Sequence, residues 1–335
     1  MHYDVIIIGS GLSGLAAGIR LAMFDKKVCI VEKHTVIGGL NSFYTRKHRT
    51  FDVGLHAMTN YSPRGVRSSP LGKLLKQLRF SHDDFRLCQQ EMSEIRFPGK
   101  SLRFTNDFAF LQQEVAEQFP SQMDGFRKLV QKITDFDALS LSDNTWVSSR
   151  QMLETFFSDP MLIDMLFCPL MYYGNAQERD MDFYQFVVMF KSIFMEGFAK
   201  PVGGMHYILN LLREKYENLG GELRLGAEVS SIHVKGRSVR SIDLVDGQSL
   251  EADNVISSMG YVETLRRCQP LLHNEDDEEV GRLTFMEFIF VLDKEPKELG
   301  YDRSITFFCS RPQFKYLVPD QLTDVTSGVL CCPNN

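Results

Sequence analysis

The sequence predicts an α/β protein in which a doubly wound domain with a β-meander is interrupted by an α+β domain. Three observations lead to this fold class. A glycine-rich turn joins an apolar strand to a helix within the first forty residues. The strand expected next in such a sheet is delayed by well over a hundred residues, which indicates an inserted domain. Closely spaced short strands with tight turns then follow in residues 231–252.

The glycine-rich turn carries the strongest motif in the chain. Residues 4–8 form a short apolar run, the glycines are Gly9, Gly11 and Gly14, and residues 15–22 have helical spacing. Gly9 permits a tight turn, Gly11 allows a pyrophosphate to approach the backbone, and Gly14 lets the helix lie close to the strand. The N-terminus of this helix would face the phosphates with its free N–H groups. The motif therefore predicts a Rossmann-like dinucleotide site.

A carboxylate stands at the distance that such a site requires. The second apolar run, residues 28–31, ends on Glu32, about 20 residues after the glycines. A carboxylate in this position accepts both ribose hydroxyls and repels a 2′-phosphate. The competing interpretation is a structural glycine-rich turn beside a surface glutamate. The strand, helix and acid together favour the dinucleotide site.

Composition excludes several classes of function. The chain has 335 residues and a net charge of −6, which argues against a nucleic-acid partner. Its seven cysteines include no C-x-x-C pair, so we expect no metal site, and their scattered spacing suits the reducing cytoplasm. No run reaches 18 apolar residues and no signal peptide is recognisable. Peripheral contact with a membrane stays open.

A second stretch, residues 50–56, follows the pair Gly38 and Gly39. If that pair lies over the cofactor, residues 50–56 continue beneath its reactive end. Gly54 would then let a flat ring approach the backbone, and His56 would lie nearby as a weak catalytic candidate. A purely structural histidine is the alternative.

Residues 57–200 are predicted to hold the insertion. A hairpin is expected at 94–97 and 101–104, and helices at 107–119 and 123–136. Residues 151–198 are rich in methionine and aromatic side chains and poor in charge. Three interpretations remain for this stretch: an adaptable wall for a long hydrocarbon, a buried core, or a surface that enters a lipid leaflet.

The cofactor domain is predicted to resume near residue 200. We expect a helix at 206–219, a strand at 222–225, a three-stranded meander at 231–235, 238–244 and 248–252, and a separate strand at 253–258. A further strand is expected at 285–292. The predicted domains are therefore 1–60 with 200–260 for the cofactor, and 61–199 with 261–335 for the substrate.

Three segments together resemble the FAD-dependent phytoene desaturase, carotenoid isomerase and retinol saturase group, which has the amine-oxidase-like flavoprotein fold. They are residues 4–39, the F-D-V-G-L-H stretch 51–56, and residues 201–258, which open with P-V-G-G-M. The resemblance implies that FAD is the cofactor, with Gly9, Gly11 and Gly14 at the pyrophosphate, Glu32 at the ribose and the Val229 backbone at the adenine. It implies further cofactor contacts at Ser10, Leu12, Ser13, Lys33, Gly38, Gly39, Leu40, Gly54 and His56.

The chain departs from this group at two places. Many members have arginine after the paired glycines, where this chain has Leu40. Members also end with a strand, a G-D segment and a glycine-rich turn that closes over the flavin, and these are missing here. We therefore expect a C-terminally incomplete chain.

The resemblance implies an oxidoreductase that acts on carbon–carbon bonds of a long apolar isoprenoid, by desaturation, saturation or isomerisation. One alternative is an oxidase of amines or other small molecules. Another, from a different class, is a flavin-free binding protein that resembles the Rab GDP dissociation inhibitors. The sequence does not determine the oligomeric state or the exact substrate.

Overall fold

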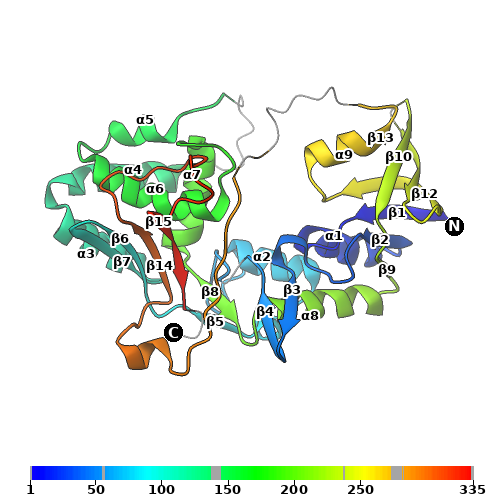
Figure 1. Cartoon of the computed structure of the whole chain (residues 1–335), viewed down its shortest axis with the longest axis horizontal. Coiled ribbons are helices and arrows are strands. Elements are labelled where there is room, and N and C mark those ends of the chain that lie inside the picture. The colour runs from blue at the N-terminus through cyan, green and yellow to red at the C-terminus, as the bar shows by residue number, and fades with distance from the viewer. Residues whose placement is uncertain are drawn as a thin grey trace. The chain divides into compact units, whose positions relative to one another are not determined.

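The computed structural model describes residues 2–54, 57–136, 145–236, 238–272, 281 and 283–332. The described chain divides into two compact units, each assembled from three segments (Figure 1). The first unit comprises residues 1–56, 72–87 and 201–280, and the second comprises 57–71, 88–200 and 281–335. Residues 72–87 and 261–280 thus belong to the first unit, whereas the sequence assigned them to the substrate domain. The chain crosses between units within β5 (Leu87–Gln89) and β8 (Ala199–Pro201).

A seven-stranded sheet forms the centre of the first unit. Its strand order is β13-β10-β11-β12-β1-β2-β9, and β12, β1, β2 and β9 run parallel to their neighbours in this part of the sheet. The delayed strand is therefore β9, which the insertion separates from β2. The strands are β1 (His2–Ile8), β2 (Val28–Glu32), β9 (Glu222–Leu225), β10 (Val229–Lys235), β11 (Ser238–Leu244), β12 (Ser249–Ser257) and β13 (Cys268–Gln269).

Strand β12 corrects one detail of the sequence interpretation. The third meander strand and the following parallel strand are a single element. Its beginning pairs antiparallel with β11, while Glu251 to Ser257 pair in parallel with β1. The meander is thus continuous with the parallel sheet.

Helices α1 (Leu12–Ala22) and α8 (Met205–Asn218) pack against each other in the first unit. The apolar face of α1 is buried as its spacing predicts. A Cβ on Gly18 would lie 2.9 Å from Ile30 Cδ1 and from the Tyr216 ring, so glycine permits the close contact of α1 with β2 and α8. The Tyr216 hydroxyl donates to the Val28 carbonyl at 2.9 Å, which fixes α8 to the sheet. The unit also contains α9 (Tyr261–Arg267), most of α2 (Pro70–Leu78) and the hairpin β3 (Phe43–Arg46) and β4 (Arg49–Asp52).

The second unit contains a four-stranded sheet with the order β15-β14-β6-β7. The predicted hairpin is β6 (Ser93–Phe97) and β7 (Lys100–Phe104), with Phe97 opposite Lys100. Strand β14 (Ile305–Cys309) runs parallel to β6, and β15 (Ser327–Cys331) antiparallel to β14. The predicted helices are α3 (Phe108–Gln118) and α4 (Met123–Asp135). The other helices are α5 (Ser149–Glu154), α6 (Pro160–Gly174), α7 (Phe183–Phe190) and the π-helix η4 (Lys191–Met195).

Short polar side chains set the starts of four helices in this unit. Asp107, Ser148, Asp159 and Asp182 each accept a first-turn N–H of the helix that follows. Such a side chain satisfies a backbone donor that would otherwise lack a partner. The helix boundaries therefore follow from local chemistry that the sequence displays.

The methionine- and aromatic-rich stretch forms core in the second unit. Phe167, Phe186, Phe190, Phe194 and Phe198 are all fully buried and belong to one apolar cluster. Of the three interpretations, the structure supports buried core for these side chains. The exceptions Tyr184 and Val188 on α7 are about 40% exposed.

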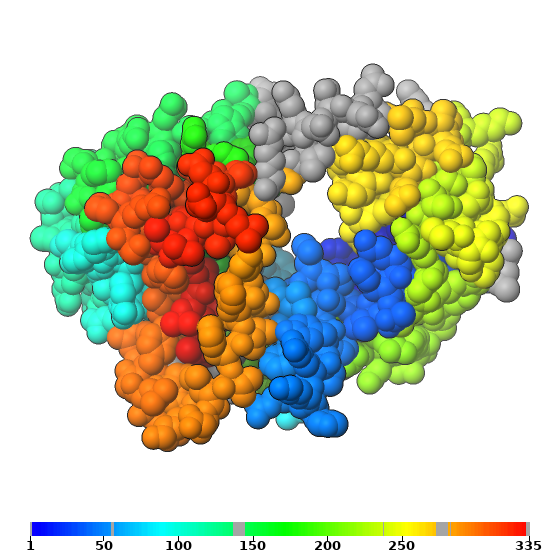
Figure 2. Space-filling model, viewed as in Figure 1, coloured from blue at the N-terminus to red at the C-terminus, as the bar shows by residue number. Residues whose placement is uncertain are grey.

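The predicted strand at residues 285–292 is wrong, because the described chain has no strand or helix there. Its apolar side chains are exposed, with Phe288 at 69% and Phe290 at 78%. The segment lies beside β15 (orange beside red in Figures 1 and 2). At its start, the ring centroid of Phe285 is 6.3 Å from that of Tyr172 on α6. The segment is apolar, as a buried strand would be, but a β-strand also requires a neighbouring strand to which it can hydrogen-bond.

Two further features complete the fold. All seven cysteines are free, and burial raises the pKa of the Cys29 thiol to about 11. None of the helices in the described ranges is both long and apolar enough to cross a bilayer. The acidic run at 274–279 lies outside the described residues.

We predict that Phe104→Ala destabilises the second unit by about 3–5 kcal/mol, the range for removal of a buried aromatic ring. The Phe104 ring is fully buried and lies within 5.2 Å and 5.8 Å, between centroids, of Phe194 and Phe198. Urea unfolding followed by fluorescence of Trp146, the only tryptophan in the sequence, measures the loss. The matched control is Phe290→Ala on an exposed ring, which should cost less than about 0.5 kcal/mol. Equal losses in the two variants would contradict the assigned core.

Candidate functional site: a glycine-walled cradle at the end of β1

The turn between β1 and α1 is built by glycines that have different roles. Gly9 directly follows β1 and has a φ of +101°, which favours glycine. A Cβ on Gly14 would lie 2.0 Å from the Gly9 carbonyl oxygen, so α1 contacts the turn more closely than any side chain allows. Both of these glycines are required by the protein's own packing.

Gly11 differs from its two neighbours in the motif. Its φ is −68°, which any residue can adopt. A Cβ there would meet only the Gly38 carbonyl oxygen, at 3.8 Å. Gly11 is also the N-cap of α1 and offers no side chain to the first turn. The first-turn N–H groups of α1 therefore have no side-chain cap from the N-cap residue, and the Cβ position of Gly11 is open, as an anion site requires.

Glu32 is turned toward this glycine turn at the carboxyl edge of the sheet. The residue is 7% exposed, and its Oε2 accepts from the Ser10 N–H at 2.8 Å and from the Ser10 hydroxyl at 2.9 Å. Its Oε1 accepts from the His34 N–H at 3.0 Å. A carboxylate has about four acceptor positions. Three contacts orient Glu32 and leave capacity on Oε1 for a further donor.

A second glycine loop closes the cradle on the other side. The Gly38 N–H donates to the Ser10 carbonyl at 3.0 Å, and Gly38 forms a bridge with Gly11. Gly38 has a φ of +117°, and a Cβ there would lie 2.7 Å from Leu209 Cδ1 on α8. Gly39 is exposed, and a Cβ on it would lie 3.6 Å from Gly11 Cα. The structure thus brings Gly9, Gly11, Gly38 and Gly39 together.

The remaining predicted contacts lie around this cradle. Leu12 and Ser13 open α1, and Lys33 is exposed directly after Glu32. Val229 begins β10 with a buried side chain. The chain between β9 and β10 passes the end of β2, where the Ala227 N–H donates to the Glu32 carbonyl at 2.8 Å. That the Val229 backbone contacts adenine stays a prediction.

Gly54 lies close to the backbone of Leu40. A Cβ on Gly54 would lie 2.6 Å from the Leu40 carbonyl oxygen, so glycine at this position accommodates the chain itself. The Leu40 side chain is 90% exposed. His56, the catalytic candidate, lies outside the described residues.

The structure joins two motifs that the sequence left separate. Asp52, in the F-D-V-G-L-H stretch, accepts from the Met205 N–H at 2.8 Å and from the His206 N–H at 3.1 Å. These are the first-turn donors of α8, whose own N-cap is Gly204. The sequence contains a hint of this contact. The G-G pair precedes a helix that has no Ser, Thr, Asp or Asn at its start, so a cap has to come from elsewhere in the chain.

One polar cluster in the second unit surrounds a carboxyl group. Asn60 Nδ2 donates to Glu196 Oε2 at 2.6 Å and to the Ser192 hydroxyl at 3.1 Å. Asn60 has a φ of +61°, and Ser192 lies in the π-helix η4, a type of element frequent at functional sites. Burial raises the pKa of the Glu196 carboxyl above its ordinary value.

Two other polar groupings favour structural roles. Ser231, His233 and Asp243 form a cluster, but the Nε2 atom of His233 contacts both Asp243 (2.6 Å) and Ser231 (3.3 Å). In a catalytic triad the acid and the nucleophile contact different ring nitrogens. This cluster therefore does not have the arrangement of a proton relay.

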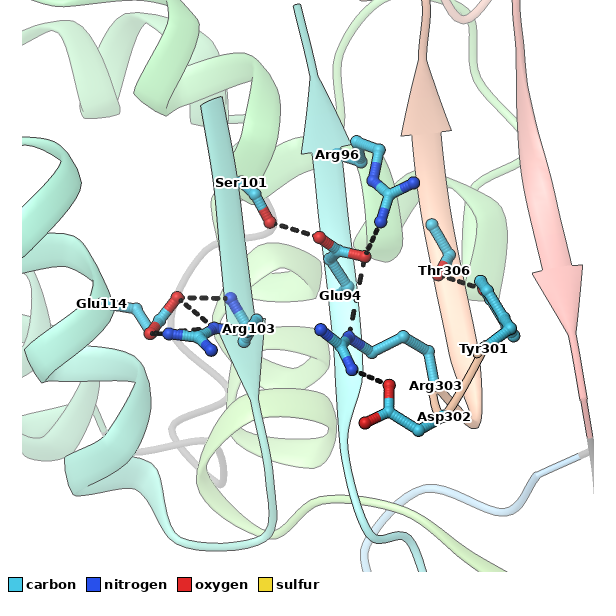
Figure 3. A network of polar contacts seen from close by, with 9 residues as sticks. All are labelled: Glu94, Arg96, Ser101, Arg103, Glu114, Tyr301, Asp302, Arg303 and Thr306. Carbon is cyan, nitrogen blue, oxygen red and sulfur yellow. Dashed lines mark hydrogen bonds and ion pairs between the residues drawn. The ribbon is translucent and has the colours of Figure 1, made fainter. Parts of the chain in front are cut away.

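The other grouping lies on the outer face of the second unit's sheet (Figure 3). The buried Glu94 accepts from Arg96 at 2.7 Å and from Ser101 at 2.5 Å, and it lies 3.7 Å from Arg303, which also pairs with Asp302. Two guanidinium groups thus balance two carboxylates. A shallow hollow of about 400 Å³ beside Arg96 contains none of the predicted site residues.

Comparison with known proteins decides the family. The model of the family described as flavin containing amine oxidoreductase matches residues 12–262. The chain belongs to this family. Among curated relatives, prolycopene isomerase 2 of an Oncidium hybrid cultivar is 23% identical over 287 residues, covering 77% of this chain and 48% of that protein. The 4,4'-diapolycopene oxygenase of Methylomonas is 26% identical over 285 residues, covering 78% and 57%.

Solved structures agree on the fold. An oxidoreductase from Methanosarcina mazei superposes with a TM-score of 0.61 at 23% identity, covering 82% of this chain and 63% of that chain. A triple mutant of putrescine oxidase gives 0.58 at 18% identity, covering 81% and 61%. The chain spans about half the length of the curated relatives it matches.

Membership of this flavin family makes FAD the cofactor of the chain. The cradle fits that group on its own geometry. The open position at Gly11 and the uncapped N-terminus of α1 suit a pyrophosphate, and the oriented Glu32 carboxylate suits a ribose. Residue-level contacts with FAD stay predictions.

We predict that Gly11→Ala and Gly14→Ala separate cofactor binding from folding. Alanine at position 11 fits the apo structure, so it should leave the melting temperature within about 1 °C and weaken FAD binding by at least about tenfold. Alanine at position 14 collides with the Gly9 carbonyl and should lower the melting temperature of the apo protein. Thermal melts and flavin fluorescence titrations measure the two effects. Undiminished FAD binding by Gly11→Ala would place the pyrophosphate elsewhere.

We predict that Glu196→Gln stabilises the protein at pH 7 but not at about pH 3.5. The folded state raises the pKa of Glu196, so the wild type loses stability as the pH rises from the unfolded value, about 4.3, through the folded one. Glutamine is neutral throughout and keeps an oxygen for Asn60. Thermal melts of both proteins across this range give the difference. A difference that does not change with pH would contradict the desolvated carboxyl.

Proposed function

We propose that this chain is an FAD-dependent oxidoreductase that acts on carbon–carbon bonds of a long apolar isoprenoid. The observation that carries the enzyme class is the glycine cradle, which is open at Gly11 and has an oriented carboxylate at Glu32. Bound FAD supplies a group that accepts or donates hydride. The chain's own residues bind and orient it, through glycine backbone, the N-terminus of α1 and Glu32.

The substrate class rests on the relatives. Their names specify prolycopene, phytoene and diapolycopene, which are long polyene hydrocarbons. Such a substrate has almost no polar handles, so its binding depends on buried apolar area. We propose the second unit as the substrate-binding part. Its large apolar cluster is core, while the apolar side chains of Tyr184 and Val188 on α7 are about 40% exposed. Desaturation, saturation and isomerisation are all compatible with these features.

The proposal is tested by expressing the chain in bacteria that accumulate phytoene, prolycopene or lycopene and separating the pigments by chromatography. We expect one of these pools to change its degree of unsaturation or its double-bond geometry. Gly11→Ala is the matched control, because its predicted defect is in FAD binding rather than folding. Unchanged pigments with flavin bound to the purified protein would contradict the substrate class and leave the enzyme class.

Oxidation of an amine is the second candidate, favoured by the family model that matches the chain, which is described as flavin containing amine oxidoreductase. The same purified protein should be assayed with putrescine for peroxide release. Peroxide formation that depends on the amine, together with unchanged pigments, would favour this candidate. A colourless protein that does not take up FAD would contradict both and favour a flavin-free binding role.

A further inference from the structure

We propose that Asp52 is a positioning residue that holds the flavin-side half of the cradle, the loop 38–42 together with residues 52–54, in place for FAD. Asp52 makes no predicted contact with the cofactor. It acts through α8, against which this half of the cradle is built. The proposal rests on FAD as the cofactor and does not depend on the substrate.

The first observation is the way in which Asp52 is bound. Its carboxylate is 13% exposed and accepts three hydrogen bonds from two residues at the start of α8. Oδ2 accepts from the Met205 N–H, while Oδ1 accepts from the His206 N–H and contacts His206 Nδ1 at 2.8 Å. Asp52 is thus an N-cap supplied by a residue about 150 positions earlier in the chain. Its charge also complements the positive end of the helix.

The second observation is that the carboxylate can approach the helix only because the N-cap residue is glycine. Gly204 has a φ of +91°, and a Cβ there would lie 2.3 Å from Asp52 Oδ2. Helix α8 has no acidic residue in its own first turn, and no side chain caps it locally. The G-G pair therefore leaves room for Asp52, which supplies what the helix lacks.

The third observation connects this helix end to the cradle. Leu209 lies one turn into α8, and its Cδ1 would be 2.7 Å from a Cβ on Gly38. On the hairpin side, the Val53 N–H donates to the Ser42 carbonyl at 2.7 Å, directly after Asp52. A Cβ on Gly54 would in turn lie 2.6 Å from the Leu40 carbonyl oxygen. Asp52 thus joins the two supports of the loop 38–42, which are α8 and the β3–β4 hairpin.

The adenosine-side half is built by different contacts. The two halves are linked by the Gly38 N–H, which donates to the Ser10 carbonyl. Glu32 is oriented by the Ser10 N–H and hydroxyl and by the His34 N–H, and none of these three contacts involves residues 38–42 or 52–54. Loss of the Asp52 contacts should therefore loosen one half of the cradle and leave the other. A loosened loop is in the binding-competent position only part of the time, and the apparent affinity falls by that fraction.

The experiment compares two ligands of different length. ADP reports the adenosine and phosphate positions, and FAD reports both halves. In Asp52→Asn only one side-chain oxygen remains for three donors, and the amide NH₂ faces at least one of them. We therefore expect FAD binding to weaken about tenfold while ADP binding changes less than about twofold. Isothermal titration of the apo protein measures both ligands. Glu32→Gln should weaken ADP and FAD together.

Two further variants separate positioning from general damage. His206→Ala removes one of the three contacts and keeps both backbone donors, so its FAD defect should be smaller than that of Asp52→Asn. Asp124→Asn is the matched control, since the Asp124 side chain is 89% exposed on α4. It should bind both ligands as the wild type does.

Each outcome decides the proposal. Equal weakening of ADP and FAD by Asp52→Asn would show a general structural role and overturn it. Unchanged binding of both ligands would also overturn it. If the wild type binds neither ligand, the FAD assignment fails and the proposal falls with it. That failure appears in the wild type, whereas a failure of the Asp52 proposal alone appears only in the variants.

Discussion

The close contact between Gly14 and the Gly9 carbonyl is the constraint on which the cofactor unit depends. Because no Cβ separates them, α1 begins directly over the end of β1 and its first-turn donors meet the carboxyl edge of the sheet. The same principle recurs along α1 at Gly18, where Ile30 and Tyr216 occupy the space of a side chain. Two glycines on one helix face thus set its distance from β1, β2 and α8. The position of the cradle follows from that distance.

Much of the cofactor unit could be predicted from the sequence because its signals are local. Strand β1, the glycine turn, helix α1 and the acid at the end of β2 lie within 32 residues. The hairpin β6–β7 and the helices α3 and α4 were equally recognisable from turn residues and spacing. These elements owe their form to propensity, capping and periodicity, all of which a short window of sequence contains.

The errors share a cause in long-range pairing. The sequence predicts two strands where the structure has the single strand β12, because the residue pattern changes along it. Its beginning pairs with β11, and the rest, from Glu251 onward, pairs with β1. The segment 285–292 was read as a strand from composition, yet no neighbouring strand pairs with it in the described structure. The Asp52 contacts with α8 span about 150 residues and were invisible to local analysis. The contact between Gly54 and the Leu40 carbonyl, 14 residues apart, was equally invisible, and a ring contact at Gly54 stays a prediction.

The exposed segment beside β15 has a consequence for handling the protein. Its composition combines β-branched and aromatic residues over a length typical of sequences that pair between molecules, and Glu287 is its only charge. At high concentration such a surface favours self-association through the backbone, independently of the cofactor unit. A single added lysine within it, at Phe288 or Phe290, would act as a gatekeeper and improve solubility without touching the apolar core.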